Sequence, residues 1–168
     1  MSLIAAAALA TGVFMALERT RPDAPDATAV SALTLARFSD LQGREQAIRA
    51  WQGKIRIVNF WATWCPPCRQ EIPGLIAIQQ RHAANGVEVI GIAIDRADKV
   101  RTYAAEMKIA YPILIAGFDA LEIARQLGNK SGALPFTVVL DRNGGLVKTH
   151  LGLLTEAELE ALLAPLLG

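Results

Sequence analysis

Cysteine, histidine and aromatic residues are scarce in this chain of 168 residues, which has two cysteines and two histidines. A disulfide-stapled scaffold needs more cysteines at wider spacing, and the short loop between these two would gain little stability from a cross-link. The pair therefore indicates chemistry rather than structural stapling. His82 and His150 do not lie at zinc-ligand spacing, so no metal site is expected.

An excess of charge of either sign is also missing, because 17 basic and 16 acidic residues leave a net charge of +1. This balance gives no electrostatic reason to propose nucleic acid as a partner. The hydrophobic fraction of 52% and the charged fraction of 20% are typical of a globular protein rather than a disordered one. The length suits one well-buried domain plus a short extension.

The longest uncharged apolar run, residues 3–17, would span about 22 Å as a helix, short of the ~30 Å hydrocarbon core of a bilayer. We interpret residues 1–18 as a signal peptide or a membrane anchor, with a helix packed on the domain as the alternative. Residues 19–31 contain two prolines and several small residues, as a linker does, and residues 32–168 are expected to form one domain. Arg19 and Arg21 follow the run and no basic residue precedes it, which by the positive-inside rule would leave the domain in the cytoplasm.

Hydrophobic periodicity in the remainder predicts alternating strands and helices. The expected strands are Leu33–Phe38, Ile55–Trp61, Val87–Asp95, Tyr111–Ile115, Phe136–Asp141 and Leu146–Leu151. The expected helices are Pro66–Ala84, kinked or restarted at Pro73, then Ala97–Met107, Ala120–Leu127 and Thr155–Leu167, while Arg44–Trp51 is either a short helix or a loop. Thr155 and Glu158 form a capping box, and the last two strands flank a hairpin signal. This order predicts an α/β sheet that is parallel in its first half and antiparallel at its end.

The stretch Trp64-Cys65-Pro66-Pro67-Cys68 lies where a buried strand is expected to meet a helix. Disulfide exchange uses the thiolate, and a cysteine at a helix N-terminus faces unsatisfied N–H groups and the positive end of the helix dipole. Cys65 would occupy that position, whereas Cys68, one turn further, would be more shielded. Pro66 and Pro67 suit the first helical positions but remove two N–H donors. A moderately stabilised Cys65 thiolate favours a reductant over a strong oxidant.

Pro135 lies at the entry to the strand that begins at Phe136. A cis Leu134–Pro135 bond would cost only about 0.5–1 kcal/mol and would leave the Leu134 backbone exposed to pair with an extended substrate segment. An ordinary trans proline at the start of a strand is the alternative. The residues alone do not decide between them.

The stretch Ile57–Leu75 (IVNFWATWCPPCRQEIPGL) resembles the active-site region of the TlpA/ResA branch of the thioredoxin superfamily, which includes the CcmG-type reductases of cytochrome c maturation. The resemblance runs from about Leu33 to Leu167. It implies a thioredoxin-like fold, a central mixed sheet flanked by helices, with an N-terminal β extension. Cys65 becomes the attacking thiol, Cys68 the resolving thiol and Pro135 the cis-proline. The implied substrate groove consists of Pro135, Leu134, Trp64, Pro66 and Pro67.

The same resemblance implies a thiol–disulfide oxidoreductase that is anchored or secreted, faces the periplasm or the outer side of the membrane, and reduces disulfides in partner proteins. Maturation of cytochrome c or of an oxidase is one such setting, with electrons from a membrane thiol donor. We expect a monomer anchored by residues 3–17, with no cofactor besides the redox-active Cys65–Cys68 disulfide. The alternatives are a disulfide oxidant or isomerase, a thiol-based copper carrier and a non-catalytic docking domain.

The sequence departs from classical thioredoxins at Asn59, which stands where they place a buried Asp, so that acid is not available as a proton relay. Members of the branch often use a Glu near the third strand of the domain. The nearest acids here are Glu88, Asp95 and Asp98, and Asp95, at the carboxyl end of its strand, is our choice as the acid. Glu71 is interpreted as a helix-surface or packing residue.

Overall fold

The computed structural model describes residues 27–168. The signal peptide or anchor predicted for residues 1–18, and the first part of the linker predicted for 19–31, lie outside the described residues. The elements in chain order are α2 (Ala27–Leu35), β1 (Arg37–Asp40), β2 (Glu45–Ala47), η1 (Ile48–Trp51), β3 (Ile55–Trp61), α3 (Pro66–His82), η2 (Ala83–Asn85), β4 (Val87–Ile94), α4 (Ala97–Glu106), β5 (Ile113–Ala116), α5 (Ala120–Gln126), β6 (Phe136–Leu140), β7 (Leu146–Leu151) and α6 (Glu156–Leu167).

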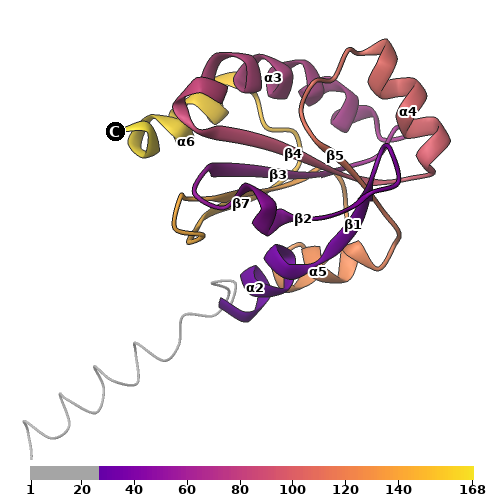
Figure 1. Cartoon of the computed structure of the whole chain (residues 1–168), viewed down its shortest axis with the longest axis horizontal. Coiled ribbons are helices and arrows are strands. Elements are labelled where there is room, and N and C mark those ends of the chain that lie inside the picture. Colours follow the sequence, from indigo (N-terminus) through magenta and orange to yellow (C-terminus); the bar gives the residue numbers. More distant parts are fainter. Residues whose placement is uncertain (1–26) are drawn as a thin grey trace, which may run out of the picture.

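One seven-stranded sheet in the order β2-β1-β5-β4-β3-β6-β7 organises the fold (Figure 1). Strands β3, β4 and β5 are parallel, whereas β6 runs antiparallel to β3 and pairs with β7 as a hairpin. Strands β1 and β2 add an antiparallel extension on the other side. The predicted thioredoxin-like fold, parallel in its first half and antiparallel at its end, is confirmed.

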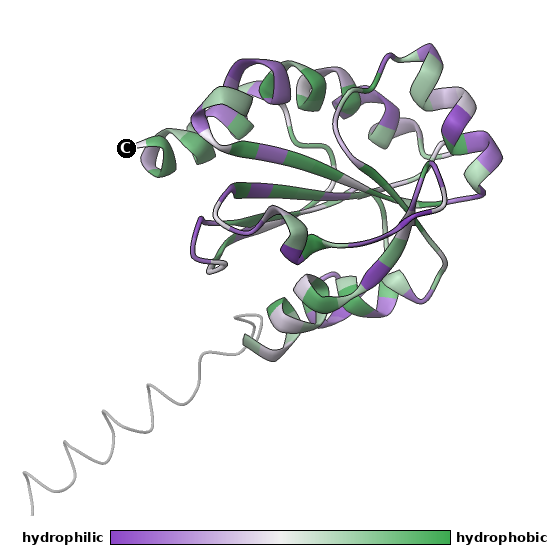
Figure 2. Cartoon of the chain, viewed as in Figure 1, coloured by the Kyte–Doolittle hydropathy of each residue, from purple (hydrophilic) through white to green (hydrophobic). Residues whose placement is uncertain are grey.

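Helices cover both faces of this sheet, with α3, α4 and α6 on one side and α2 and α5 on the other (Figure 1). Strands β3 and β4 are therefore buried along their whole length, and their ribbons are mostly in the hydrophobic colour in Figure 2. A strand buried on both faces carries a nearly continuous apolar run instead of an alternating one. Of the helices within residues 27–168, none combines the length and apolar character that crossing a bilayer requires.

The start of the described chain corrects two predictions. Leu33–Phe38, predicted as a strand, is split between helix α2 and strand β1. Ala29 and Leu33, four residues apart, are buried together on one helical face, and this spacing outweighs the short alternation that follows Leu33. Residues 27–31 also belong to this helix rather than to a linker.

Two further elements differ in detail from the prediction. Arg44–Trp51 is neither a single helix nor a loop, because it contains strand β2 followed by the 3-10 helix η1. Helix α3 runs through Pro73 without restarting. The capping box of Thr155 and Glu158 at the start of α6 is confirmed. Arg81 of α3 pairs with Glu156 of α6 at 2.8 Å, which ties α6 against the helix that begins at the cysteines.

Candidate active site

The two cysteines lie at the junction of β3 and α3, as the sequence predicts. Cys65 is the N-cap residue of α3, and Cys68 lies one turn into that helix. Their sulfur atoms form a disulfide with an S–S distance of 2.10 Å. Cys65 is 4% exposed and Cys68 is completely buried, so an incoming sulfur atom can approach only Cys65.

The first turn of α3 offers the Cys65 sulfur few N–H donors. Pro66 and Pro67 occupy the first two helical positions and have no N–H group. The backbone N–H of Cys68 donates to Cys65 Sγ at 3.3 Å, and the next N–H, that of Arg69, donates to the Cys65 carbonyl at 3.2 Å. A single backbone donor is therefore left to stabilise negative charge on Cys65 Sγ.

Asp95, at the carboxyl end of β4, holds the loop that precedes Cys65. Its carboxylate accepts hydrogen bonds from the Thr63 backbone N–H at 3.1 Å, from the Thr63 hydroxyl, and from the Arg96 N–H at 2.7 Å. These contacts fix the position of Trp64 and Cys65. The choice of Asp95 as the proton-relay acid stays a prediction, and the contacts favour a positioning role for it.

Glu71 is the buried acid of the site, whereas the sequence analysis interprets it only as a helix-surface or packing residue. It follows Cys68 by three residues on α3, so the two side chains are neighbours on one helical face. The side chain is buried, with Oε1 accepting from Asn59 Nδ2 at 2.6 Å and Oε2 accepting from the Leu154 N–H at 3.2 Å. Burial raises the pKa of Glu71 to about 7, although both hydrogen bonds oppose the shift.

A signal for Glu71 does exist in the sequence. The buried positions of α3 include Cys68, Ile72, Leu75 and Ile78, and Glu71 belongs to the same stripe at helical spacing. The interpretation of Glu71 as a helix-surface residue is therefore wrong. The distant partner Leu154, which the helical pattern does not reveal, completes the carboxylate's environment.

Asn59 connects this acid to the sheet. Its amide Nδ2 donates to both Glu71 and the hydroxyl of Thr137 on β6, the latter at 3.0 Å. All three side chains are buried. The acid that classical thioredoxins carry at the position of Asn59 is thus replaced here by an amide that donates to an acid on the helix.

The loop before β6 runs alongside the cysteines. Phe136 pairs with Phe60 near the end of β3, which brings Pro135 beside Trp61. The Leu134–Pro135 peptide bond is cis, as the resemblance implies. Pro135 is buried and Leu134 partly buried. Their roles in holding substrate stay predictions.

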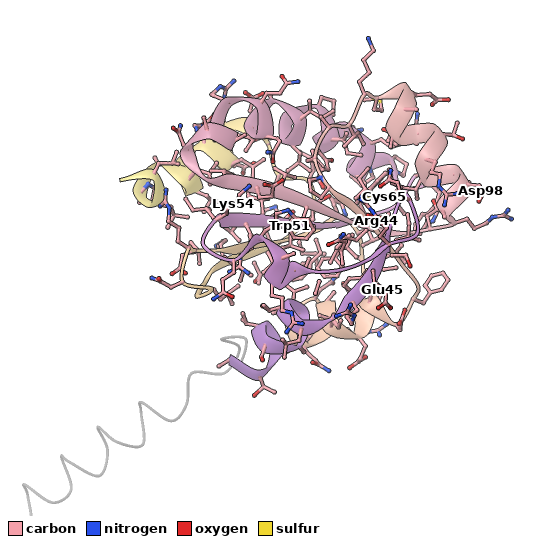
Figure 3. All side chains as sticks on the ribbon, in the orientation of Figure 1. Arg44, Glu45, Trp51, Lys54, Cys65 and Asp98 are labelled. Atoms are coloured by element: carbon pink, nitrogen blue, oxygen red, sulfur yellow. A yellow bond between two sulfur atoms is a disulfide. The ribbon has the colours of Figure 1, made fainter. Side chains whose placement is uncertain are left out.

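The surface around Cys65 mixes exposed and buried rings. Trp64 is exposed, as is Pro66, and Pro67 is half-exposed. Trp61, in contrast, is fully buried, and its ring packs on Tyr103 of α4 with centroids 5.7 Å apart. Figure 3 shows Cys65 and Asp98 of α4 at one end of the molecule, away from Lys54 at the start of β3.

The site thus consists of a nearly buried sulfur at a helix start, with a second, completely buried sulfur and a buried acid on the same helix. The family model described as Redoxin matches residues 22–163. This chain belongs to the Redoxin family. Thiol-disulfide oxidoreductase ResA from Geobacillus thermodenitrificans is 31% identical to it over 124 residues, covering 73% of this chain and 69% of that protein.

Two further comparisons agree with this assignment to the Redoxin family. Thioredoxin-like protein YneN from Bacillus subtilis is 34% identical over 124 residues, 71% of this chain and 69% of that protein. The crystal structure of a thiol:disulfide interchange protein of the thioredoxin family from Chlorobium tepidum superimposes with a TM-score of 0.68 at 30% identity, covering 79% of this chain and 93% of that one.

The Redoxin protein described here is a thiol–disulfide oxidoreductase, and its partners carry disulfides. Its dithiol can pass two electrons to a partner, and its disulfide can accept them. Between residues 27 and 168, no group of three His, Cys, Asp or Glu side chains is placed to hold a metal ion.

Proposed function

We propose that this Redoxin protein works in the reducing direction, breaking disulfides of partner proteins outside the cytoplasm, for example in cytochrome c or oxidase maturation. The observation that carries the proposal is the single N–H donor to Cys65 Sγ. Donors to the thiolate stabilise the reduced form and make a dithiol more oxidising, as in strong oxidants with a very low cysteine pKa. A site with one donor therefore gives electrons readily.

In this reaction the Cys65 thiolate attacks one sulfur of the partner's disulfide. A Cys65–partner disulfide forms, and the other partner sulfur leaves as a thiolate. The Cys68 thiolate then attacks Cys65 Sγ, which forms the Cys65–Cys68 disulfide and releases the second partner thiolate. Two electrons pass from the dithiol to the partner, and a donor dithiol restores the reduced pair.

Glu71 is the group that takes the proton from Cys68 in the second step. Cys68 is completely buried, and burial in apolar surroundings raises the pKa of a thiol, so it needs a nearby base. Glu71 lies one turn away, and its pKa of about 7 suits a group that alternately accepts and gives a proton near neutrality. No cofactor besides the cysteine pair is required.

The proposed location rests on the apolar run of residues 3–17, which would export the domain or anchor it in the membrane. We propose that the protein acts there as a monomer. A membrane thiol donor on the same side of the bilayer would then supply electrons. Arg19 and Arg21, which follow the apolar run, favour the opposite orientation by the positive-inside rule.

The chemistry is tested with a partner peptide containing one disulfide. The reduced wild-type protein should convert it to the dithiol, and Cys68→Ser should accumulate a covalent complex with the peptide that dithiothreitol releases. Cys65→Ser, the matched control, should form no complex because the remaining thiol is buried. A complex that forms equally well through Cys68 would contradict the assignment of the attacking sulfur.

A further inference from the structure

A groove of about 380 Å³ lies beside the cysteine site, over the carboxyl ends of β4 and β5. Ile94 and Ala116 contribute its apolar wall, and the rings of Trp64 and Phe118 also line it. The carboxyl ends of the parallel strands β3, β4 and β5 meet at one edge of the sheet, so the groove and the cysteines share that edge. None of the steps proposed above uses this groove.

Two rings of the groove are unusually open to solvent. Trp64 is 58% exposed and Phe118 is 76% exposed, and they are the exposed aromatic side chains of residues 27–168. Scattered apolar residues on a surface need no explanation, but two aromatic rings on one groove form a patch of the kind that binds another molecule. Aromatic anchors of this type commonly carry most of the energy of a protein interface.

The groove is continuous with the reacting sulfur. Trp64 directly precedes Cys65, and Asp95 holds the loop through Thr63, so the backbone that carries Trp64 is held next to the sulfur. A partner whose cysteine reaches Cys65 must cover Trp64. Its neighbouring residues then lie within reach of Phe118.

The rim of the groove carries charges of both signs. The Arg96 guanidinium is engaged by Asp98 through two 3.0 Å contacts, and the Asp95 carboxylate accepts from the Thr63 and Arg96 backbone N–H groups. Lys99 also lines the groove and has no ion-pair partner among the described residues. An acidic side chain is the complementary group for this rim.

We propose that this groove is a subsite for the partner's polypeptide, taking a large apolar side chain close to the reacting cysteine and an acidic side chain beyond it at Lys99. This inference rests on the proposed function. Trp64 and Phe118 hold the apolar side chain, and Lys99 attracts the acidic one. The subsite thereby selects extended segments that combine a cysteine, an apolar residue and an acid.

The test uses short peptides with one cysteine each, linked as disulfide dimers, in which a Phe is moved along successive positions on both sides of the cysteine. Reduced wild-type protein should reduce one register about tenfold faster, in kcat/KM, than the same peptide with Gly for Phe, as expected for an aromatic anchor. Phe118→Ala should abolish that ratio. Leu35→Ala, which shortens an exposed apolar side chain on α2, should preserve it.

The preference for an acidic side chain is tested with peptides in the preferred register that carry Asp or Lys at the position expected to reach Lys99. Wild type should favour Asp by about two- to fivefold, as exposed ion pairs do, and Lys99→Glu should reverse the preference. Equal rates for every peptide in the wild type would overturn the inference while leaving the proposed function intact. If the protein reduces neither the peptides nor a small disulfide such as hydroxyethyl disulfide, the proposed function is overturned instead.

Another occupant of the groove would also overturn the inference. A dimer in sedimentation that Phe118→Ala dissociates would mean that a second copy of this chain fills it. Tryptophan fluorescence that acrylamide quenches no more in the free wild-type protein than in Trp64→Phe would mean that the groove is already covered. The inference requires a monomer in which acrylamide quenches Trp64.

Discussion

At the scale of single residues, the site consists of two sulfur atoms and a buried acid at the start of α3. Cys68 is completely buried, whereas Cys65 and Glu71 each keep a small exposed fraction of 4%. Asn59 and the Leu154 N–H hold the carboxylate with donated hydrogen bonds, yet burial dominates and raises its pKa to about 7. The carboxyl group is thus partly protonated at neutral pH.

Glu71 predicts a specific dependence of stability on pH. Its pKa rises from an ordinary value of 4.5 to about 7 on folding, so the folded state binds the proton more tightly between those values. The free energy of unfolding should therefore fall by about 3 kcal/mol as pH rises from about 4.5 to 7, and this contribution should be level above that. Urea unfolding of the oxidised protein at a series of pH values measures the effect.

Glu71→Gln removes the titrating group while keeping the shape of the side chain, and it should flatten that part of the pH profile. Glu106→Gln, on the exposed face of α4, is the matched control and should leave the profile as in the wild type. An unchanged decline in the Glu71→Gln variant would assign the pH dependence to other groups.

Much of the site could be predicted at this scale because it is encoded locally. Cys65, Cys68 and their prolines are adjacent in the sequence, and the helix start follows from their order. The resemblance identified Pro135. The helical stripe of α3 gives a signal for the burial of Glu71, but a Glu on a helix is usually exposed, and its partner Leu154 lies far along the chain, so the environment of the carboxylate could not be predicted.

At the scale of elements, the close approach of β4 to the Trp61 ring constrains the sheet beneath the cysteines. A Cβ at Gly91 would lie 2.9 Å from Trp61 Nε1 and 3.3 Å from Tyr111 Cε2, both of them buried ring atoms. These rings are held by their neighbours, since Trp61 packs on Tyr103. Gly91 is therefore required because a side chain has no room at this position, and not because of its backbone conformation.

Gly91→Ala should lower the free energy of unfolding by about 1–3 kcal/mol, as overpacking of a filled core does. Gly74→Ala on α3 is the control, because its Cβ would make an ordinary 3.4 Å contact with Glu156 Cβ. Helix propensity should make that variant neutral or up to about 1 kcal/mol more stable. Equal effects of the two substitutions in urea unfolding would refute the packing argument.

The start of α6 matters for the site because it follows the Leu154 N–H that binds Glu71. The Thr155 hydroxyl accepts from the Glu158 N–H at 3.3 Å, and Glu158 accepts from the Thr155 N–H at 2.8 Å. Thr155→Ala should lower the free energy of unfolding by about 1 kcal/mol. Thr102→Ala, an exposed position within α4, should change it by less than half of that amount in the same unfolding assay.

Elements with strong periodicity could be predicted from the sequence, and those with weak signals could not. Strands β3 and β4 carry long apolar runs, and α6 has both a cap and an apolar face. The two-residue signal of Ala29 and Leu33 in α2 is short, and α2 is stabilised by packing on α5 and η1 rather than by its own sequence.

For the whole molecule, one edge of the sheet concentrates the functional groups. Cys65, Asp95 and Phe118 follow the carboxyl ends of β3, β4 and β5, and Pro135 precedes the antiparallel strand β6 at the same edge. The parallel core thus places the attacking sulfur, the loop that positions it and the proposed subsite side by side. The packing of α3 on one face of the sheet buries the second sulfur and the acid.

The direction of electron flow is the central claim, and the equilibrium reduction potential of the Cys65–Cys68 pair tests it most directly. The potential can be measured against dithiothreitol and glutathione, with tryptophan fluorescence reporting the state of the pair. The account predicts a value of about −230 mV or lower, near that of thioredoxin-type reductants. A value near about −120 mV, typical of a strong oxidant, would contradict it and would mean that the protein installs disulfides in its partners.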